Sequence, residues 1–230
     1  MKAGRFGIMG TAILAVLAAV LFTGDSDAVV RRPQLIDGVY FGGVVGYQSI
    51  SGDFKGNSYI RVPSLYEDNY IPEIDGGMGF GIVGGFKRGR GAFEISYVRS
   101  AHDASYQGIN TDVVFQAFNF DVKYYPLPYI PTQPFLMVGL SVPWLKAENT
   151  SHNDVYGIDD AKFTGIGLNL GTGVLLKFTP HMALTGTVGY RWISYGSVKG
   201  ASDEKIDISN VNGSGIMFQA GLVYTFPSHL

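Results

Sequence analysis

The sequence predicts an all-β fold, an eight-stranded antiparallel up-and-down transmembrane β-barrel. Three observations support this prediction. Eight segments alternate between bulky apolar residues and small or polar ones, with the period of two that is typical of a β-strand. The connections between these segments alternate in length, with four long loops and three mostly shorter turns, as they do in an up-and-down membrane barrel. Glycine supplies 32 of the 230 residues, whereas charged residues supply only 16%, below the ~25% of an average soluble domain.

The eight predicted strands follow one another between residues 38 and 226. The last one shows the pattern most clearly, because every second residue from Ile216 to Phe226 is apolar or aromatic. Pro143 falls inside the fifth strand, where a bulge or an early strand end would accommodate it. The strands are predicted at 38–50, 78–87, 91–99, 116–125, 135–145, 163–177, 182–193 and 216–226, with long connections at 51–77, 100–112, 146–161 and 196–213.

The bulky face of these strands is predicted to contact lipid, and the small polar face to line the interior. The lumen of an eight-stranded barrel has room only for side chains, whereas lipid-facing positions have no such limit. Closure of the barrel also satisfies the backbone N–H and C=O groups in hydrocarbon. The alternative is a soluble, lipocalin-like ligand-binding barrel with the two faces inverted, but its solvent-facing side would then consist mainly of glycine.

Residues 1–28 are predicted to be a signal peptide. Lys2 gives a basic start, Phe6 to Phe22 is an apolar stretch, and Ser26 and Ala28 are small residues suited to a cleavage site. A retained helical anchor is the alternative, although this stretch is shorter than the ~20 residues that span a bilayer. The remaining chain is then divided into a periplasmic N-terminal lead at 29–37, the barrel at 38–226 and a C-terminal tail at 227–230.

Composition excludes several classes of site. The chain has no cysteine, so it forms no disulfide, no thiolate metal site and no cysteine nucleophile. Its net charge of −2 gives no general attraction to nucleic acid. No cofactor or metal site is predicted.

Aromatic residues gather near the strand ends, which predicts an aromatic girdle at each membrane interface. The preference of aromatic residues for strands in general is the alternative explanation. The girdle near the shorter turns is predicted to contain Phe41, Phe86, Tyr124, Phe178, Tyr224 and Phe226, and the girdle near the long loops Phe80, Tyr97, Trp144 and Trp192.

Six charged residues fall on the predicted lumen face: Lys87, Glu94, Asp121, Lys123, Lys177 and Arg191. The first five lie near the shorter turns, where we expect them to form salt bridges, because an unpaired charge in a narrow lumen is costly. Arg191 lies about ten residues up its strand, too far to reach that cluster at ~3.3 Å per residue, and its partner is left open. A narrow ion path gated by these pairs is the alternative to a packed lumen.

Three segments carry a resemblance to a known family: GVYFGGVVGYQ at 38–48, GLNLGTGVLLKFTPHMALTGTVGYRWI at 167–193 and GLVYTF at 221–226. They resemble the small eight-stranded outer-membrane barrels, such as the transmembrane domain of outer-membrane protein A, protein X and the opacity proteins. The resemblance implies a porin-like protein of a Gram-negative outer membrane, in contact with lipid and lipopolysaccharide. It also implies that the barrel assembly machinery recognises Tyr224 and Phe226, although PSHL after Phe226 departs from the family's ending.

The expected role is structural or surface interaction through four extracellular loops, as in envelope integrity or adhesion. The largest loop carries Tyr59, Tyr66 and Tyr70 among acidic residues, which suits a binding surface, although a polar loop without a ligand has the same composition. A narrow porin-like channel for ions or small solutes is the alternative function.

An enzyme is not expected. A catalytic triad needs a base within hydrogen-bond reach of its nucleophile, and sequence neighbours in loops rarely provide that geometry. The candidates considered are His102, Asp103 and Ser105 in one loop and Ser151, His152 and Asp154 in the next.

Overall fold

The computed structural model describes residues 37–55, 59–61, 68–70, 73–106, 109–148, 160–199 and 205–227. The predicted signal peptide, the lead up to residue 36 and the tail from residue 228 lie outside these ranges, so those assignments stay predictions. The described ranges contain no helix that is both long and apolar enough to cross a membrane.

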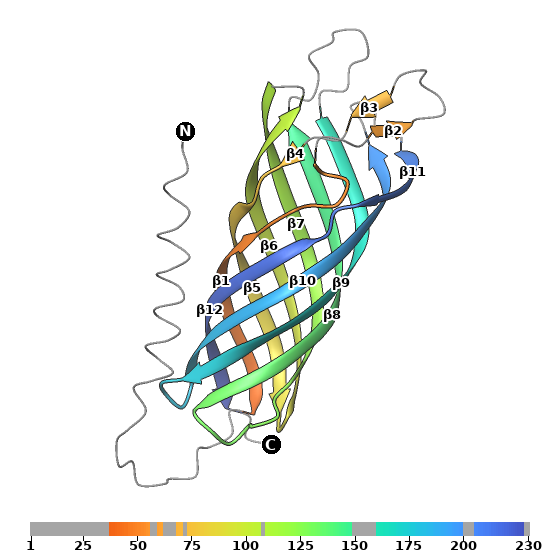
Figure 1. Cartoon of the computed structure of the whole chain (residues 1–230). Coiled ribbons are helices and arrows are strands. Elements are labelled where there is room, and N and C mark those ends of the chain that lie inside the picture. The colour runs from red at the N-terminus through yellow and green to blue at the C-terminus, as the bar shows by residue number, and fades with distance from the viewer. Residues whose placement is uncertain are drawn as a thin grey trace. The chain divides into compact units, whose positions relative to one another are not determined.

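Eight long antiparallel strands close into a barrel (Figure 1). Each pairs with its neighbours, and β1 pairs along its full length with the last strand, from Gly38 opposite Pro227 to Gln48 opposite Met217. The predicted fold is therefore confirmed. The strands are β1 (Gly38–Gln48), β5 (Gly77–Arg88), β6 (Gly91–Tyr106), β7 (Ile109–Tyr124), β8 (Thr132–Glu148), β9 (Asp160–Lys177), β10 (Met182–Lys199) and β12 (Gly215–Pro227).

Four shorter strands belong to the predicted long loops. β4 (Glu73–Ile74) pairs with the end of β6, and β11 (Lys205–Asn212) pairs with the end of β10. β2 (Tyr59–Arg61) and β3 (Asp68–Tyr70) form a separate antiparallel pair. These strands add backbone pairing to the long-loop end of the barrel.

The main strands extend further into the predicted loops than the sequence indicated. β6 continues to Tyr106 and β7 begins at Ile109, so most of the predicted loop 100–112 is strand. Other strands that border long loops are extended as well, for example β8 to Glu148 and β10 to Lys199, whereas β1 ends at Gln48, two residues before its predicted end. The prediction ended each strand where its outer face ceased to be apolar, but the backbone pairing continues beyond that point.

The apolar residues of β7 change from the outer face to the lumen face along the strand. In the half of β7 near the shorter turns, Phe120 is 41% exposed on the outer face and Asp121 is buried in the lumen. Toward the long-loop end of the same strand, Phe115 is fully buried and Asp112 is exposed. Along β7, the outer face is therefore apolar in the half near the shorter turns, and the lumen face is apolar in the half near the long loops.

Pro143 lies in β8 without a bulge and without ending the strand, contrary to the prediction. It is aligned with Ala117 on the β7 side, while on the β9 side the ladder lacks pairs between Ser141 and Trp144. The register of β8 against β9 is the same before and after this interruption. Since proline has no N–H to donate, the pairing is lost at the position where it costs least.

Candidate functional site

The lumen is the candidate site, and apolar side chains occupy both of its ends. We call the two groups the long-loop cluster and the short-turn cluster. The long-loop cluster includes Phe54, Val113, Phe115, Leu145, Phe163 and Tyr195. The short-turn cluster includes Tyr40, Val83, Tyr125, Phe135, Met137 and Val223. The sequence predicted a small polar lumen face throughout, so the size of these buried side chains is a correction.

Phe54 of the first long loop reaches into the long-loop cluster. Its side chain is 1% exposed, and its ring packs edge-on against Phe163 and Tyr195 at centroid distances of 5.7 and 5.6 Å. The segment that carries it is fixed by backbone pairing, with the Asp53 N–H donating to the Asn212 carbonyl at 2.9 Å. Sequence reasoning missed Phe54, because a single aromatic residue in a turn produces no periodic pattern.

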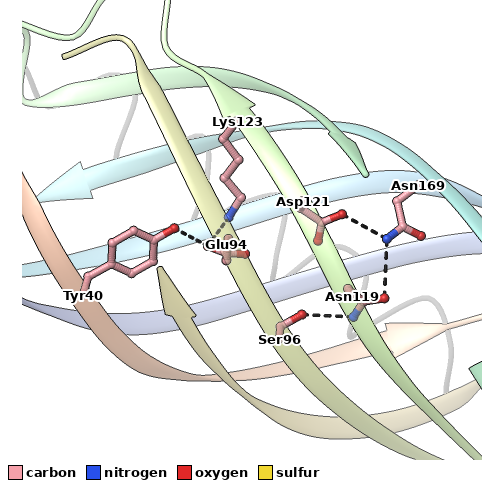
Figure 2. A network of polar contacts seen from close by, with 7 residues as sticks. All are labelled: Tyr40, Glu94, Ser96, Asn119, Asp121, Lys123 and Asn169. Carbon is pink, nitrogen blue, oxygen red and sulfur yellow. Dashed lines mark hydrogen bonds and ion pairs between the residues drawn. The ribbon is translucent and has the colours of Figure 1, made fainter. Parts of the chain in front are cut away.

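A buried ion pair lies beside the short-turn cluster, and Figure 2 shows its side chains. The Lys123 ammonium of β7 donates to the Glu94 carboxylate of β6 at 2.6 Å. The Tyr40 hydroxyl of β1 donates to the same carboxylate oxygen at 2.8 Å. Glu94 is 9% exposed and Lys123 4%, so the two charges compensate each other away from bulk water.

A second set of polar side chains runs across the lumen from β6 to β9 (Figure 2). The Asn169 amide donates to Asp121 Oδ1 at 3.0 Å and to Asn119 Oδ1 at 3.4 Å. The Asn119 amide in turn donates to the Ser96 hydroxyl at 3.0 Å. These contacts satisfy the hydrogen-bonding groups of side chains that are almost fully buried.

Arg191 connects to this set from β10. Its Nε donates to Asn169 Oδ1 at 2.8 Å, one terminal nitrogen donates to Asn119 Oδ1 at 3.0 Å, and the other donates to Gln48 Oε1 at 3.2 Å. Arg191 is 2% exposed. The Arg191 guanidinium therefore donates to amide oxygens rather than to carboxylates. The Asp121 carboxylate is linked to Arg191 through Asn169, which contacts both. This arrangement answers the question of partners that the sequence left open.

The two other predicted lumen lysines lie nearer the shorter turns. Lys87 is 2% exposed, donates to the Gly89 carbonyl at 3.0 Å and lies 4.0 Å from Asp37. Lys177 is half-buried at the end of β9. Of the expected salt bridges, the structure therefore brings together Glu94 with Lys123 and places Lys87 beside Asp37.

The interior glycines make room for these side chains. A Cβ atom on Gly139 would lie 2.0 Å from Asp121 Oδ1 and 2.4 Å from the Phe120 carbonyl oxygen. We therefore expect Gly139→Ala to lower the free energy of unfolding by about 1–3 kcal/mol, as overpacking does, measured by urea titration in detergent micelles. Gly43→Ala is the control, because its nearest neighbour would be 3.8 Å away. Equal effects of the two substitutions would contradict this assignment.

His102 lies on β6 rather than in a loop, which corrects the sequence-based placement. Its imidazole is 3% exposed, with Nε2 2.8 Å from the Ser100 hydroxyl and Nδ1 2.9 Å from the Asp75 carbonyl oxygen. Asp103 is exposed on the opposite face of the strand, so His102, Asp103 and Ser105 do not converge. The second candidate group, residues 151–154, lies outside the described residues. Within the described part of the chain, no three acidic or histidine side chains are grouped as a metal site.

Comparison with known proteins identifies the barrel. The family model described as outer membrane protein beta-barrel domain matches residues 13–226. The chain belongs to this family. The family sets the barrel in the bacterial outer membrane, so the apolar outer half faces lipid, and the soluble ligand-binding alternative is wrong.

Solved structures of outer-membrane barrels share the fold. Neisserial surface protein A is 19% identical with a TM-score of 0.53, and the alignment covers 83% of this chain and 98% of that one. The outer membrane protein OprG from Pseudomonas aeruginosa is 15% identical with a TM-score of 0.54, over 84% and 98% of the two chains. No curated protein matches the chain by sequence. At these identities the similarity concerns the fold alone.

On the outer-membrane barrel, the ten predicted girdle residues all lie on the exposed outer surface. Their exposure ranges from intermediate for Tyr97 and Trp144 to 65% for Phe80. Tyr97, Phe118 and Trp144 form a cluster across β6, β7 and β8, with ring centroids 5.2 to 6.2 Å apart. That these aromatic residues lie at the two membrane interfaces stays a prediction.

The structure describes only some of the residues predicted to contact partners. Tyr224 and Phe226 are exposed near the end of β12, with ring centroids 5.0 Å apart, and their recognition by the assembly machinery stays a prediction. In the first loop, Tyr59 of β2 is opposite Tyr70 of β3 in the backbone register. Tyr66 lies outside the described residues. A ligand for this loop also stays a prediction.

Proposed function

We propose that this protein is a non-enzymatic surface protein of the outer membrane, with a structural or surface-interaction role carried by the loops that its barrel holds. The observation that carries the proposal is the filled lumen. Arg191, Asn169 and Asn119 bridge β7, β9 and β10 between two apolar clusters, and all three side chains are at most 2% exposed. A lumen filled in this way favours a structural role over the conduction of solutes.

A narrow porin-like channel is the second candidate. The observation that favours it is a small cavity of about 20 Å³, room for about one water molecule, next to the Arg191 network. Gln48 and Met217 line this pocket and also contact Arg191. Solutes would have to pass both this network and the long-loop cluster, so conduction would require side chains to move.

Conductance in planar lipid bilayers separates these two functions. We expect the purified protein to give no reproducible current steps. The double variant Phe54→Ala/Arg191→Ala removes a side chain from the long-loop cluster and one from the polar network, and we expect it to give steps, which shows that the assay detects insertion. Reproducible steps from the unmodified protein would contradict the scaffold proposal and favour the channel.

A further inference from the structure

A turn with an apolar outer surface joins β7 to β8 at the short-turn end, the lower end of the barrel in Figure 1. Residues 126–131 have the sequence PLPYIP and carry no charge. The side chains of Leu127, Tyr129 and Ile130 are all exposed. Exposed apolar groups that lie together mark a site of contact with a protein or a membrane, which raises the question of what covers them.

The apolar surface of this turn is continuous with the lipid-facing wall of β8 and β9. The Lys177 N–H at the end of β9 donates to the Pro131 carbonyl at 3.1 Å, which places the turn beside Phe178. Phe178 is exposed, and so is Leu136 near the start of β8, where the apolar outer face of that strand begins. We call the four exposed residues of the two turns the turn patch: Leu127, Tyr129, Ile130 and Phe178.

The inward side of the same turn keeps the turn patch facing outward. Tyr125 and Pro128 are buried. The Tyr125 N–H donates to the Arg90 carbonyl at 2.7 Å, and the Tyr125 ring lies 5.5 Å from the ring of Phe135. The interior space at this end is therefore filled, and the exposed apolar side chains cannot bury themselves by turning inward.

The backbone of the turn suits surroundings that contain little water. Pro126, Pro128 and Pro131 have no N–H group, and the Pro128 and Pro131 carbonyls accept from the Gln133 side-chain amide and the Lys177 N–H. An unpaired backbone group is costly in hydrocarbon, so the loss of three donors lowers the cost of contact with lipid. A protein partner usually forms about one hydrogen bond per 100–200 Å² of interface, for which this turn offers few donors.

We propose that the turn patch inserts among the phospholipids of the leaflet that faces the periplasm, at the boundary between the headgroups and the acyl chains. The short turns of outer-membrane barrels lie on the periplasmic side, and tyrosine is enriched at membrane–water interfaces. The patch then anchors β7, β8 and β9 at a fixed depth in the membrane. This proposal is independent of the role of the long loops and of whether the lumen conducts.

A single tryptophan in the turn measures this contact. The chain has two tryptophans, and Trp144→Phe/Trp192→Phe removes both, so that Tyr129→Trp supplies the one reporter. The full barrel is folded into phosphatidylcholine vesicles, and the fluorescence is quenched with phospholipid brominated near the headgroup, with phospholipid brominated near the chain end, or with aqueous iodide. In the same background, Leu136→Trp is the reference for a position on the lipid-facing wall.

We expect phospholipid brominated near the headgroup to quench the reporter at position 129 strongly, and the other two quenchers to act weakly. Adding Leu127→Ser/Ile130→Ser should reverse this order in favour of iodide, because the turn loses its apolar side chains. The matched control Leu127→Met/Ile130→Met keeps an apolar surface and should retain the quenching by lipid. The reference reporter at position 136 should stay quenched by lipid in the serine variant, which shows that the barrel is still inserted.

Three results would overturn the proposal. Strong quenching by iodide with the unmodified turn would show that the turn lies in water, as a site left for a periplasmic protein would in these vesicles. Protection from all three quenchers that disappears when the protein is diluted in lipid would show that a second copy covers the patch. Unchanged quenching by lipid in the serine variant would show that the apolar side chains do not make the contact.

Discussion

Replacing Lys123 by methionine should lower the free energy of unfolding by about 3–5 kcal/mol, the usual cost of removing one partner of a buried ion pair. The substitution would leave the Glu94 carboxylate in the lumen with the Tyr40 hydroxyl as its remaining donor among the contacts described. The measurement is reversible urea unfolding of the barrel in lipid vesicles, followed by tryptophan fluorescence.

The double variant Lys123→Met/Glu94→Gln is the control for this prediction. It removes both charges and keeps an acceptor for Tyr40, so most of the lost stability should return. If the double variant is as unstable as the single one, packing of the Lys123 side chain rather than charge explains the effect. If the single variant is as stable as the unmodified protein, the pair is not buried as described.

Replacing Leu222 by arginine should lower the free energy of unfolding in vesicles by about 2–4 kcal/mol, the cost of a cation on the lipid face near the bilayer midplane. Leu222 lies near the middle of β12, between Gly43 and Leu184 in the register, and is 43% exposed. The physical cause is the loss of hydration of the guanidinium group in hydrocarbon.

Val39→Arg is the matched comparison, because Val39 is 56% exposed on the same surface but lies at the end of β1. A cation near the interface costs only about 0–1 kcal/mol. The account therefore predicts a larger loss of stability for Leu222→Arg than for Val39→Arg when both variants are unfolded from lipid vesicles. Equal costs at the two positions would show that the assignment of membrane depth is wrong.

Sequence periodicity was sufficient to predict the barrel, its eight strands and the lipid-facing set. Residues such as Phe118, Phe120 and Val122 are all exposed on the outer face of β7, as their alternation with Asn119 and Asp121 indicated. This works because lipid imposes the same requirement on every outward position. Pairing among the lumen charges near the shorter turns was expected from the cost of an unpaired charge, but the sequence did not indicate which residues pair; the structure pairs Glu94 with Lys123.

Other features could not be obtained from that periodicity. Beyond the lipid, the outer face of β7 turns polar and its lumen face turns apolar, so Val113 and Phe115 continue the strand in the opposite phase. A rule that ends a strand where its apolar face ends will stop too early there. The partners of Arg191 depend on the register of three strands, and the position of Phe54 depends on a turn, neither of which leaves a local pattern.

The most direct test of the account is spin labelling along β12 in vesicles, which is straightforward because the chain has no cysteine of its own. Single cysteines would replace Ile216, Met217, Phe218, Gln219, Ala220, Leu222 and Val223. The account predicts high accessibility to oxygen dissolved in lipid at 216, 218, 220 and 222, and low accessibility at 217, 219 and 223. Alternation in the opposite phase, or none at all, would contradict the claim that this face of the barrel contacts lipid.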